Sequence, residues 1–321
     1  MHEVDDKQWD EQLKQLGGHL YQSSLWKKFQ QAQGRHTLQD FGHGWSWLGA
    51  VRTSAAKLNY LYLSYGPTLK DEAAFKASLE SVKQAAEQAK VAFVRMDPIL
   101  DMPETSLKQA GLTEVKEMQP RYRMILDLTP ERDELWRNVS SSHRNYVNTA
   151  PKRGLRLEIS NNPADLPKFL AQQAITAKRQ GITMHPDSYY EALLNTLMPL
   201  GACKLYFART DSDYVASSIC IDWNGTRYYV YAATNDYLNR KVHAGPALLW
   251  WSVEDAKKHG LRAFDYGGVV PLDWEDHPWI GHTKFKARFG GEIVKGAGTW
   301  DMPISKGKYK LYGIAKKLGK G

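Results

Sequence analysis

The segment GHTKFKARFGG, residues 281–291, contains residue types from which a charged catalytic group could be built. Lys286 directly follows Phe285, and another phenylalanine stands three positions after the lysine. A lysine among aromatic residues is costly to desolvate unless its charge meets an anion, because apolar surroundings disfavour the ammonium form. The pattern therefore predicts that Lys286 faces a bound anion or a negative charge that develops during a reaction. The alternative is a lysine in a salt bridge at the edge of a domain.

Other familiar catalytic patterns are missing from the sequence. It has no recognisable Ser-His-Asp set, no GxSxG, no GxxxxGK[ST], and no GxGxxG that opens a helix. The ten histidines form neither HExxH nor HxH, and the acidic loop at 273–279 has no second acidic cluster to pair with it. We therefore expect no metal site. Cys203 and Cys220 lack ligand spacing, and we expect both to be reduced core residues.

Positive charge is concentrated in two segments of a chain whose formal net charge is +8. Residues 303–321 contain six lysines and no acidic residue, and a second basic cluster lies between residues 137 and 156. Such clusters attract phosphate polymers or anionic membrane surfaces, although a merely solvated surface is the other reading. The clusters consist of Lys306, Lys308, Lys310, Lys316, Lys317 and Lys320, and of Arg137, Arg144, Lys152, Arg153 and Arg156.

Two parts of the chain repeat the order strand, Gly-Pro, helix, strand, aspartate. The first copy has a strand at 59–65, a helix at about 71–90 and a strand ending at Asp97; the second has a strand at 227–233, a helix at about 246–259 and a strand ending at Asp265. In the second copy, Pro246 is expected at the first helical position. The repeat predicts an α/β protein made of two copies of one domain.

Strand–helix–strand units of this kind occur in the acyl-CoA acetyltransferase fold. That fold binds the CoA pyrophosphate on free backbone N–H groups at a helix N-terminus. In the corresponding stretch here, NRKVHAGPALL at 239–249, the glycine, Gly245, stands five residues after Arg240. Pro246, which has no N–H, is expected at the helix start. The sequence therefore predicts a shared fold without a good CoA cradle.

Six segments in order resemble the FemABX family of peptidyltransferases, which use aminoacyl-tRNA to build the cross-bridge of bacterial peptidoglycan. They are YQSSLWKKFQ, VRMDP, MQPRYRMILDL, YYVYAATNDYLNR, GPALLWWSVEDAKKHGLRAFDYGG and KFKARFGG, and they span nearly the whole chain. The resemblance implies two tandem GNAT (acetyltransferase-like) domains, with a C-terminal tail that returns to the first domain. We therefore place the first domain, which binds the acceptor, at 1–126 plus 303–321. The second, on the aminoacyl-tRNA side, spans 127–302. No sustained heptads are present, so we expect no coiled-coil arm.

The resemblance also implies roles for single residues. Phe285 and Lys286 match the family's pair that lies where the aminoacyl ester meets the acceptor amine, so Lys286 would stabilise the oxyanion of ester aminolysis. Lys286 could instead orient the ribose or phosphate of the donor. Asp97 matches the family's strand-end aspartate and could accept a proton or position the amine; an ordinary Asp-Pro turn is the alternative.

Further substrate contacts follow from the same resemblance. Trp26 and Lys28 resemble a first-domain motif that holds the acceptor's diphosphate, although an exposed helix face explains them equally well. Tyr231 and Tyr237 resemble tyrosines that contact the acceptor, and aromatic core is the alternative for Tyr231. A looser match gives the remaining two substrate-binding candidates, Arg179 and Tyr190.

The resemblance implies a transferase that joins an amino acid from charged tRNA to the stem-peptide amine of UDP-MurNAc-pentapeptide or lipid II. No cofactor or metal is expected beyond the aminoacyl-tRNA co-substrate. Phosphates of tRNA would meet the basic clusters through Arg144, Lys152, Arg153, Lys316 and Lys317. We expect a cytoplasmic monomer, with possible peripheral contact at the inner membrane face. The alternatives are an acyltransferase that uses acyl-CoA or another thioester, and a non-catalytic protein that binds RNA or membranes.

Overall fold

The computed structural model describes residues 5–181 and 183–318. The chain forms two compact units, one made of residues 1–121 and 295–321 and the other of residues 122–294. Each unit is built around one seven-stranded mixed sheet. None of the helices in the described residues is long and apolar enough to cross a membrane.

The sheet of the first unit has the strand order β1-β2-β3-β5-β14-β6, and β4 pairs with β2. Its strands are β1 Thr37–Gly42, β2 Trp45–Thr53, β3 Asn59–Leu63, β4 Thr68–Leu69, β5 Phe93–Met96, β6 Thr113–Glu114 and β14 Trp300–Pro303. Its helices are α1 Asp6–Gln15, η1 Leu20–Gln22, α2 Ser24–Ala32, α3 Ala73–Gln88, α4 Glu104–Gln109 and α12 Lys306–Lys317.

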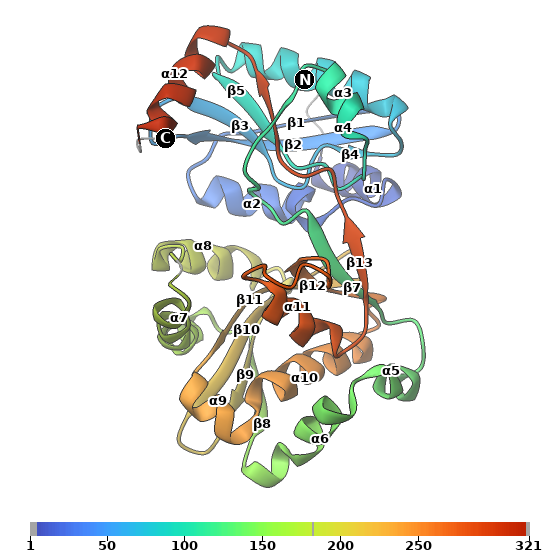
Figure 1. The fold of residues 1–321 in the computed structure, drawn as a ribbon, viewed down its shortest axis with the longest axis vertical. Coiled ribbons are helices and arrows are strands. Elements are labelled where there is room, and N and C mark those ends of the chain that lie inside the picture. Colours follow the sequence, from blue (N-terminus) through green and yellow to red (C-terminus); the bar gives the residue numbers. More distant parts are fainter. Residues whose placement is uncertain (1–4, 182, 319–321) are drawn as a thin grey trace. The chain divides into compact units, whose positions relative to one another are not determined.

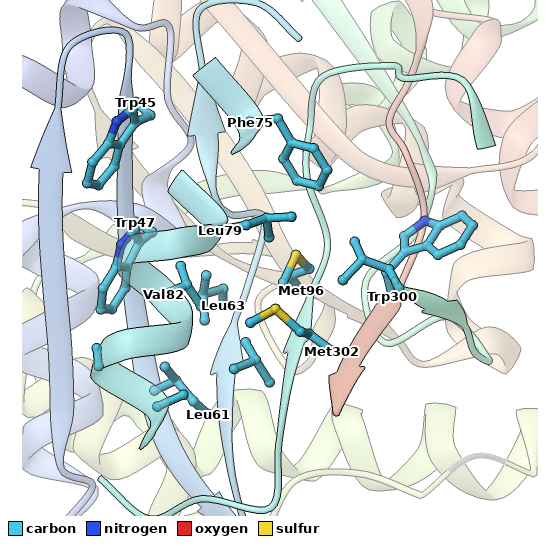
Figure 2. Packing of buried hydrophobic residues seen from close by; sticks show 14 of the residues in the cluster. Trp45, Trp47, Leu61, Leu63, Phe75, Leu79, Val82, Met96, Trp300 and Met302 are labelled. Carbon is cyan, nitrogen blue, oxygen red and sulfur yellow. The ribbon is translucent and has the colours of Figure 1, made fainter. Parts of the chain in front are cut away.

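Strand alternation gives this sheet two different faces. Successive side chains of a strand point to opposite sides, so Leu61 and Leu63 of β3 pack under α3, as Figure 2 shows, together with Trp47, Met96 and Trp300. Tyr60 and Tyr62 point to the other side, where they join Phe93 and Tyr312 of α12. The aromatic, alternating sequence of β3 is therefore explained by burial on both faces.

The C-terminal segment returns to the first unit and completes its sheet. β14, drawn in red in Figure 1, pairs antiparallel with both β5 and β6. Arg95 of β5 binds Asp301 of β14 through two hydrogen bonds of 2.7 and 2.8 Å, and both residues are buried. The hydroxyls of Tyr309 and Tyr312 in α12 complete this cluster at 3.0 Å from Asp301 and 3.3 Å from Arg95.

The sheet of the second unit has the order β13-β7-β12-β11-β10-β9-β8. Its strands are β7 Tyr122–Asp127, β8 Arg156–Ser160, β9 Cys203–Arg209, β10 Tyr214–Trp223, β11 Thr226–Thr234, β12 Ala263–Val269 and β13 Glu292–Lys295. Its helices are α5 Arg132–Asn138, α6 Ser141–Thr149, η2 Pro151–Arg153, η3 Pro163–Asp165, α7 Leu166–Gln180, α8 Asp187–Leu197, α9 Asp236–Val242, α10 Ala244–Lys258 and α11 Ile280–Ala287.

The repeated sequence pattern corresponds to the same pairing in both units. β3 and β5 pair in parallel over three residues, and so do β11 and β12. The connection between the paired strands includes α3 in the first unit and α9 and α10 in the second, as a parallel crossover requires. The predicted hairpin is also present, since β9 and β10 pair antiparallel.

Two boundaries in the predicted domain division are wrong. Residues 122–126 were assigned to the first domain, but β7 belongs to the second unit because it pairs antiparallel with β12. Residues 295–302 were assigned to the second domain, but the first unit resumes at Lys295 because β14 pairs with β5. Both errors concern strands whose partners are far away in the sequence. Local pattern does not reveal which sheet such a strand joins.

The second repeated helix also begins earlier than predicted. α10 starts at Ala244, so Pro246 is its third residue and not its first. The backbone N–H of Gly245 donates to Oδ1 of Asn239 over 2.8 Å. That contact ties the first turn of α10 to α9, which is why the helix extends back past the proline.

Candidate functional site

Lys286 lies on α11 and reaches the backbone of β12. Its Nζ donates a hydrogen bond to the carbonyl oxygen of Gly268 over 2.7 Å. Burial lowers the pKa of Lys286 to about 8, and the negative charge of Asp265 partly opposes this shift. The ammonium is therefore the main form at neutral pH, in surroundings where it interacts strongly with any nearby negative charge.

A β-bulge in β12 shapes the backbone that Lys286 contacts. The register against β7 shifts between Asp265 and Gly268, so the extra residues leave the regular ladder. Gly267, inside the bulge, has a φ of 77°, which glycine adopts without steric cost. Its N–H donates to Oδ1 of Asp265 over 2.7 Å, and Arg123 forms an ion pair with the same carboxylate.

Phe285 helps to fix α11 in place. Its ring lies 5.6 Å from those of His143 and Phe289, measured between centroids, at the margin of the second unit's core. Thr283, which is fully buried, accepts a hydrogen bond from the N–H of Val270 over 3.0 Å. The aromatic residues of the motif thus hold the helix that carries Lys286, and a substrate contact of Phe285 stays a prediction.

Two more residues of the second unit, His282 and Arg179, lie in the region of Lys286. Burial lowers the pKa of His282, and the charges of Lys286 and Arg179 lower it further. Arg179 is exposed in the last turn of α7. Because both charges act on His282, Arg179 and Lys286 lie in one region of the second unit, although they are more than 100 positions apart in the chain. A substrate contact of Arg179 stays a prediction.

Tyr231 belongs to an aromatic cluster formed by α7, α8 and β11. Its hydroxyl lies 2.8 Å from that of Tyr189, and its ring is 5.2 Å from that of Tyr190. Tyr190 is fully buried and accepts a hydrogen bond from Gln173 over 3.1 Å, so it supports Tyr231 from the core side. Tyr231 itself is half-buried and remains accessible to a ligand.

Tyr237 lies outside that cluster, on α9. It is 69% exposed, and its hydroxyl accepts a hydrogen bond from Lys241 over 2.9 Å. The Lys241 ammonium also lowers the pKa of Tyr237. Arg153 donates to the carbonyl oxygen of Lys241 over 3.3 Å, which connects α9 to the predicted basic cluster.

Asp97 continues β5 of the first unit and is almost fully buried. Its carboxylate accepts hydrogen bonds from the hydroxyls of Tyr62, over 2.7 Å, and of Thr299. Burial raises the pKa of Asp97 to about 6, because the charged form is poorly solvated there. Asp97 therefore does not only form an Asp-Pro turn. Its side chain also connects β3, β5 and the segment before β14.

Trp26 is buried in the first unit, whereas Lys28 on the same helix is half-exposed and pairs with Asp6. Positions two apart in a helix do not share a face, so the two do not act as one motif. Trp26 stacks on Tyr21 at 4.0 Å and lines a small pocket with Tyr62, the residue that donates to Asp97. Of the two residues, Trp26 therefore lies next to a partner of Asp97, and a contact of either residue with the acceptor's diphosphate stays a prediction.

The predicted tRNA-binding residues differ in their surroundings. Arg144 donates to the carbonyl oxygens of Arg137 and Val139, both over 2.8 Å, and so caps the end of α5. Lys152 is exposed in η2. Lys316 and Lys317 are exposed in the last turn of α12, in the first unit, and Lys320 of the same tail lies outside the described residues.

Comparisons with known proteins show what the chain as a whole is similar to. The chain is 27% identical to a lipid II:glycine glycyltransferase of Staphylococcus aureus (strain USA300), over 79% of each chain. A protein of the same name from Staphylococcus haemolyticus is 19% identical, over 79% of this chain and 78% of that one. Residues 137–287 match the family model of an acetyltransferase (GNAT) domain.

These similarities support the resemblance to the FemABX family. A crystal structure of FemX, 20% identical, superposes with a TM-score of 0.82 over 97% of this chain and 98% of that one. A tandem GNAT protein from the clavulanic acid pathway gives a TM-score of 0.54 at 13% identity, over 84% and 83% of the two chains. These confirm the predicted fold of two tandem GNAT domains. The longest helix among the described residues has 16 residues, in agreement with a FemABX-like protein that lacks a coiled-coil arm. The protein is an enzyme of the aminoacyltransferase class.

The start of α10 offers few free backbone N–H groups to an anion such as the CoA pyrophosphate. The N–H of Gly245 is already bound by Asn239, and Pro246 has none to offer. Fewer donors therefore remain for a pyrophosphate than an acetyltransferase helix normally supplies. Among the described residues, no group of three or more His, Cys, Asp and Glu side chains could hold a metal ion.

Sequence reasoning missed several partners of the predicted residues. Tyr62 and Thr299 hold Asp97, and Tyr189 holds Tyr231. Strand alternation places Tyr62 on the face of Arg95 and Asp97, and this signal was available in the sequence. Thr299, 202 positions from Asp97, had no such signal.

Proposed function

We propose that the protein transfers an amino acid from aminoacyl-tRNA to the stem-peptide amine of a peptidoglycan precursor, and so builds an interpeptide bridge. The observation that carries this proposal is the Lys286 ammonium of a FemABX-like chain, with a pKa lowered to about 8 and a fixed hydrogen bond to Gly268. The relatives from staphylococci, which are named lipid II:glycine glycyltransferases, support this substrate class.

The reaction is the aminolysis of an ester. The amine nitrogen attacks the ester carbonyl carbon, a C–N bond forms, and the carbonyl oxygen becomes an oxyanion. Lys286 donates a hydrogen bond to that oxygen, a contact that is strongest in the transition state. The C–O bond to the ribose then breaks, and the proton lost by the amine ends on the leaving oxygen, either directly or by way of Asp97. No cofactor other than the charged tRNA takes part.

We assign supporting roles to the residues around these groups. Asp97, with a pKa near 6, is ionised at neutral pH and accepts a proton from the acceptor amine or positions it. Arg179 meets the donor's phosphates near Lys286, and Tyr231 contacts the acceptor. Lys152 and Arg153, with Arg144, lie on the path of the tRNA backbone.

The acceptor is UDP-MurNAc-pentapeptide or its lipid-linked form. The enzyme acts in the cytoplasm, with peripheral contact at the inner face of the membrane. The basic α12 supports this location, since lysines near an anionic leaflet are attracted to it.

A transfer assay with matched lysine variants tests the proposal. Purified protein is mixed with tRNA charged with one radiolabelled amino acid at a time, and with either form of the acceptor. We expect label in the acceptor peptide only with charged tRNA. Lys286→Met should lower kcat at least about a hundredfold, the usual loss for one oxyanion donor. Lys284→Met, two positions away and exposed, should keep the wild-type rate.

Two further readouts separate catalysis from folding. Lys286→Met should unfold at a temperature no lower than the wild type, since its lowered pKa shows that folding disfavours the charge there. The wild-type rate should decline above pH 8 as Lys286 loses its proton. Transfer that survives in Lys286→Met would contradict the assigned role, and a rise in melting temperature with CoA would favour the thioester donor.

A further inference from the structure

The C-terminal helix α12 has an outward face that the fold does not use. Its inward face is held by Tyr309 and Tyr312, which pack on Phe93 with ring centroids 5.3 and 4.8 Å apart. The bonds of these tyrosines to the buried pair of Arg95 and Asp301 fix the helix further. α12 is therefore anchored to the first unit through the side that carries Tyr309 and Tyr312.

Three large apolar side chains stand on the opposite side of α12. Leu311 is 61% exposed, Ile314 48% and Leu318, at the C-cap, 70%. Their spacing of three and four residues places them in one stripe along the helix. Isolated exposed apolar residues need no explanation, but three in one stripe on a surface helix mark a contact site. We call Leu311, Ile314 and Leu318 the apolar stripe.

Lysines border the apolar stripe on both sides. At 100° per residue, Lys306 and Lys310 lie along one flank of the outward face and Lys308 along the other. All three are exposed, and the helix contains no acidic residue. A helix with a narrow apolar stripe between basic flanks is suited to lie in the plane of a lipid surface.

We propose that α12 docks the protein on an anionic membrane surface, with the apolar stripe in the acyl–headgroup boundary and the flanking lysines on lipid phosphates. The competing partner is the tRNA backbone, which the lysines alone would also attract. An RNA backbone offers nothing that buries Leu311, Ile314 and Leu318, so the apolar stripe favours the lipid surface. This proposal rests on the peripheral membrane contact of the proposed function and names the surface that makes it. It does not depend on the transfer reaction, because membrane binding needs no donor or acceptor.

Co-sedimentation of the full chain with lipid vesicles tests the proposal. The vesicles contain phosphatidylcholine with about 30% phosphatidylglycerol, and pure phosphatidylcholine vesicles are the comparison, since anionic lipid supplies the attraction. We expect binding to the anionic vesicles that weakens as salt is added, and much weaker binding to the neutral ones.

Substitution of the apolar stripe is the decisive variant. The triple change Leu311→Ser, Ile314→Ser and Leu318→Ser should lower partitioning at least about tenfold, because it removes the apolar area that enters the membrane. Leu200→Ser, at a residue 51% exposed in the second unit, is the matched control and should bind like the wild type. Leu318→Ser alone, at the helix end, should give a smaller loss without any effect on folding.

Substitution of the flanking lysines tests the electrostatic part. The triple change Lys306→Gln, Lys308→Gln and Lys310→Gln should lower partitioning about a hundredfold, at roughly fivefold for each lysine. The matched control changes three exposed lysines elsewhere in the first unit to glutamine, namely Lys76, Lys90 and Lys116. Binding of total tRNA, measured by filter retention, should be unchanged in the apolar-stripe variant.

The outcomes separate the two partners. Loss of vesicle binding in the apolar-stripe variant, with its tRNA binding intact, supports the proposal. Wild-type protein that does not bind anionic vesicles overturns it, and so does an apolar-stripe variant that binds like the wild type. A flanking-lysine variant that loses tRNA affinity while it keeps vesicle binding would assign α12 to RNA instead.

Discussion

Burial moves the pKa values of the two candidate catalytic residues toward neutrality. Lys286 shifts down to about 8 and Asp97 shifts up to about 6, because each charged form is poorly solvated where it lies. Acid–base groups work best with pKa values near the operating pH. The hydrogen bonds that Asp97 accepts and the nearby charge of Asp265 keep both residues ionised at neutral pH.

The substitution Asp97→Asn tests whether the pKa of Asp97 is raised in the folded protein. The folded-state pKa of about 6 lies above the ordinary value of about 3.9. The folded protein therefore takes up the proton first, and Asp97 makes the first unit more stable as the pH falls from 7 to 5. In urea unfolding, we expect the wild type to gain about 1 kcal/mol relative to Asp97→Asn over that range.

The control for this measurement is Asp101→Asn, a change at a half-exposed carboxylate of the same unit. It should leave the pH dependence as in the wild type. Equal pH slopes for the wild type and Asp97→Asn would show that the Asp97 carboxylate is better solvated than the structure indicates.

At the scale of elements, a small set of side-chain contacts fixes the helices and strands that carry the candidate residues. α11 is fixed by Thr283 and the phenylalanines, and the bulge in β12 presents the carbonyl group that Lys286 binds. In the first unit, β14 and α12 are held by the buried pair of Arg95 and Asp301. The position of α12, and with it the apolar stripe, depends on this pair.

Arg95→Met should therefore destabilise the first unit strongly. It would leave the fully buried carboxylate of Asp301 without its cation, which costs about 3–5 kcal/mol for a buried pair. Lys108→Met, which breaks the exposed pair with Glu104, should have no measurable effect. Urea unfolding of both variants gives the comparison. If Arg95→Met lowers the free energy of unfolding only slightly, water must reach the carboxylate of Asp301.

At the scale of the whole molecule, the chain leaves the first unit, forms the second and then returns. β14 lies between β5 and β6 and brings Trp300, which is fully buried, into the core of the first unit (Figures 1 and 2). The first unit is thus not a continuous stretch of sequence, whereas the second, residues 122–294, is.

Truncation after residue 294 tests this architecture. We expect the first unit to unfold, because its sheet loses the strand between β5 and β6, while the second unit stays folded. Limited proteolysis followed by mass spectrometry should show cleavage throughout residues 1–121 and protection of residues 122–294. Truncation after residue 318 is the control and should leave both units protected. If the first unit stays protected in the chain that ends at residue 294, it folds without β14 and the prediction is wrong.

Much of the fold was determined by the sequence alone. Local periodicity and the Gly-Pro punctuation located β3, α3, β11 and α10 to within a few residues, because these signals depend on neighbours along the chain. The Phe285-Lys286 pair was found in the same way, since a lysine in an aromatic segment is unusual wherever the segment folds.

Tertiary structure alone decided the rest. The sheets that β7 and β14 join, the burial of Tyr190 and the hydroxyls that hold Asp97 all depend on partners distant in sequence. The pKa shifts of Asp97 and Lys286 arise from desolvation, which no local pattern specifies. The tertiary structure likewise decides which face of α12 points outward, since Tyr309 and Tyr312 turn inward. An amphipathic sequence does not state which of its faces the fold will cover.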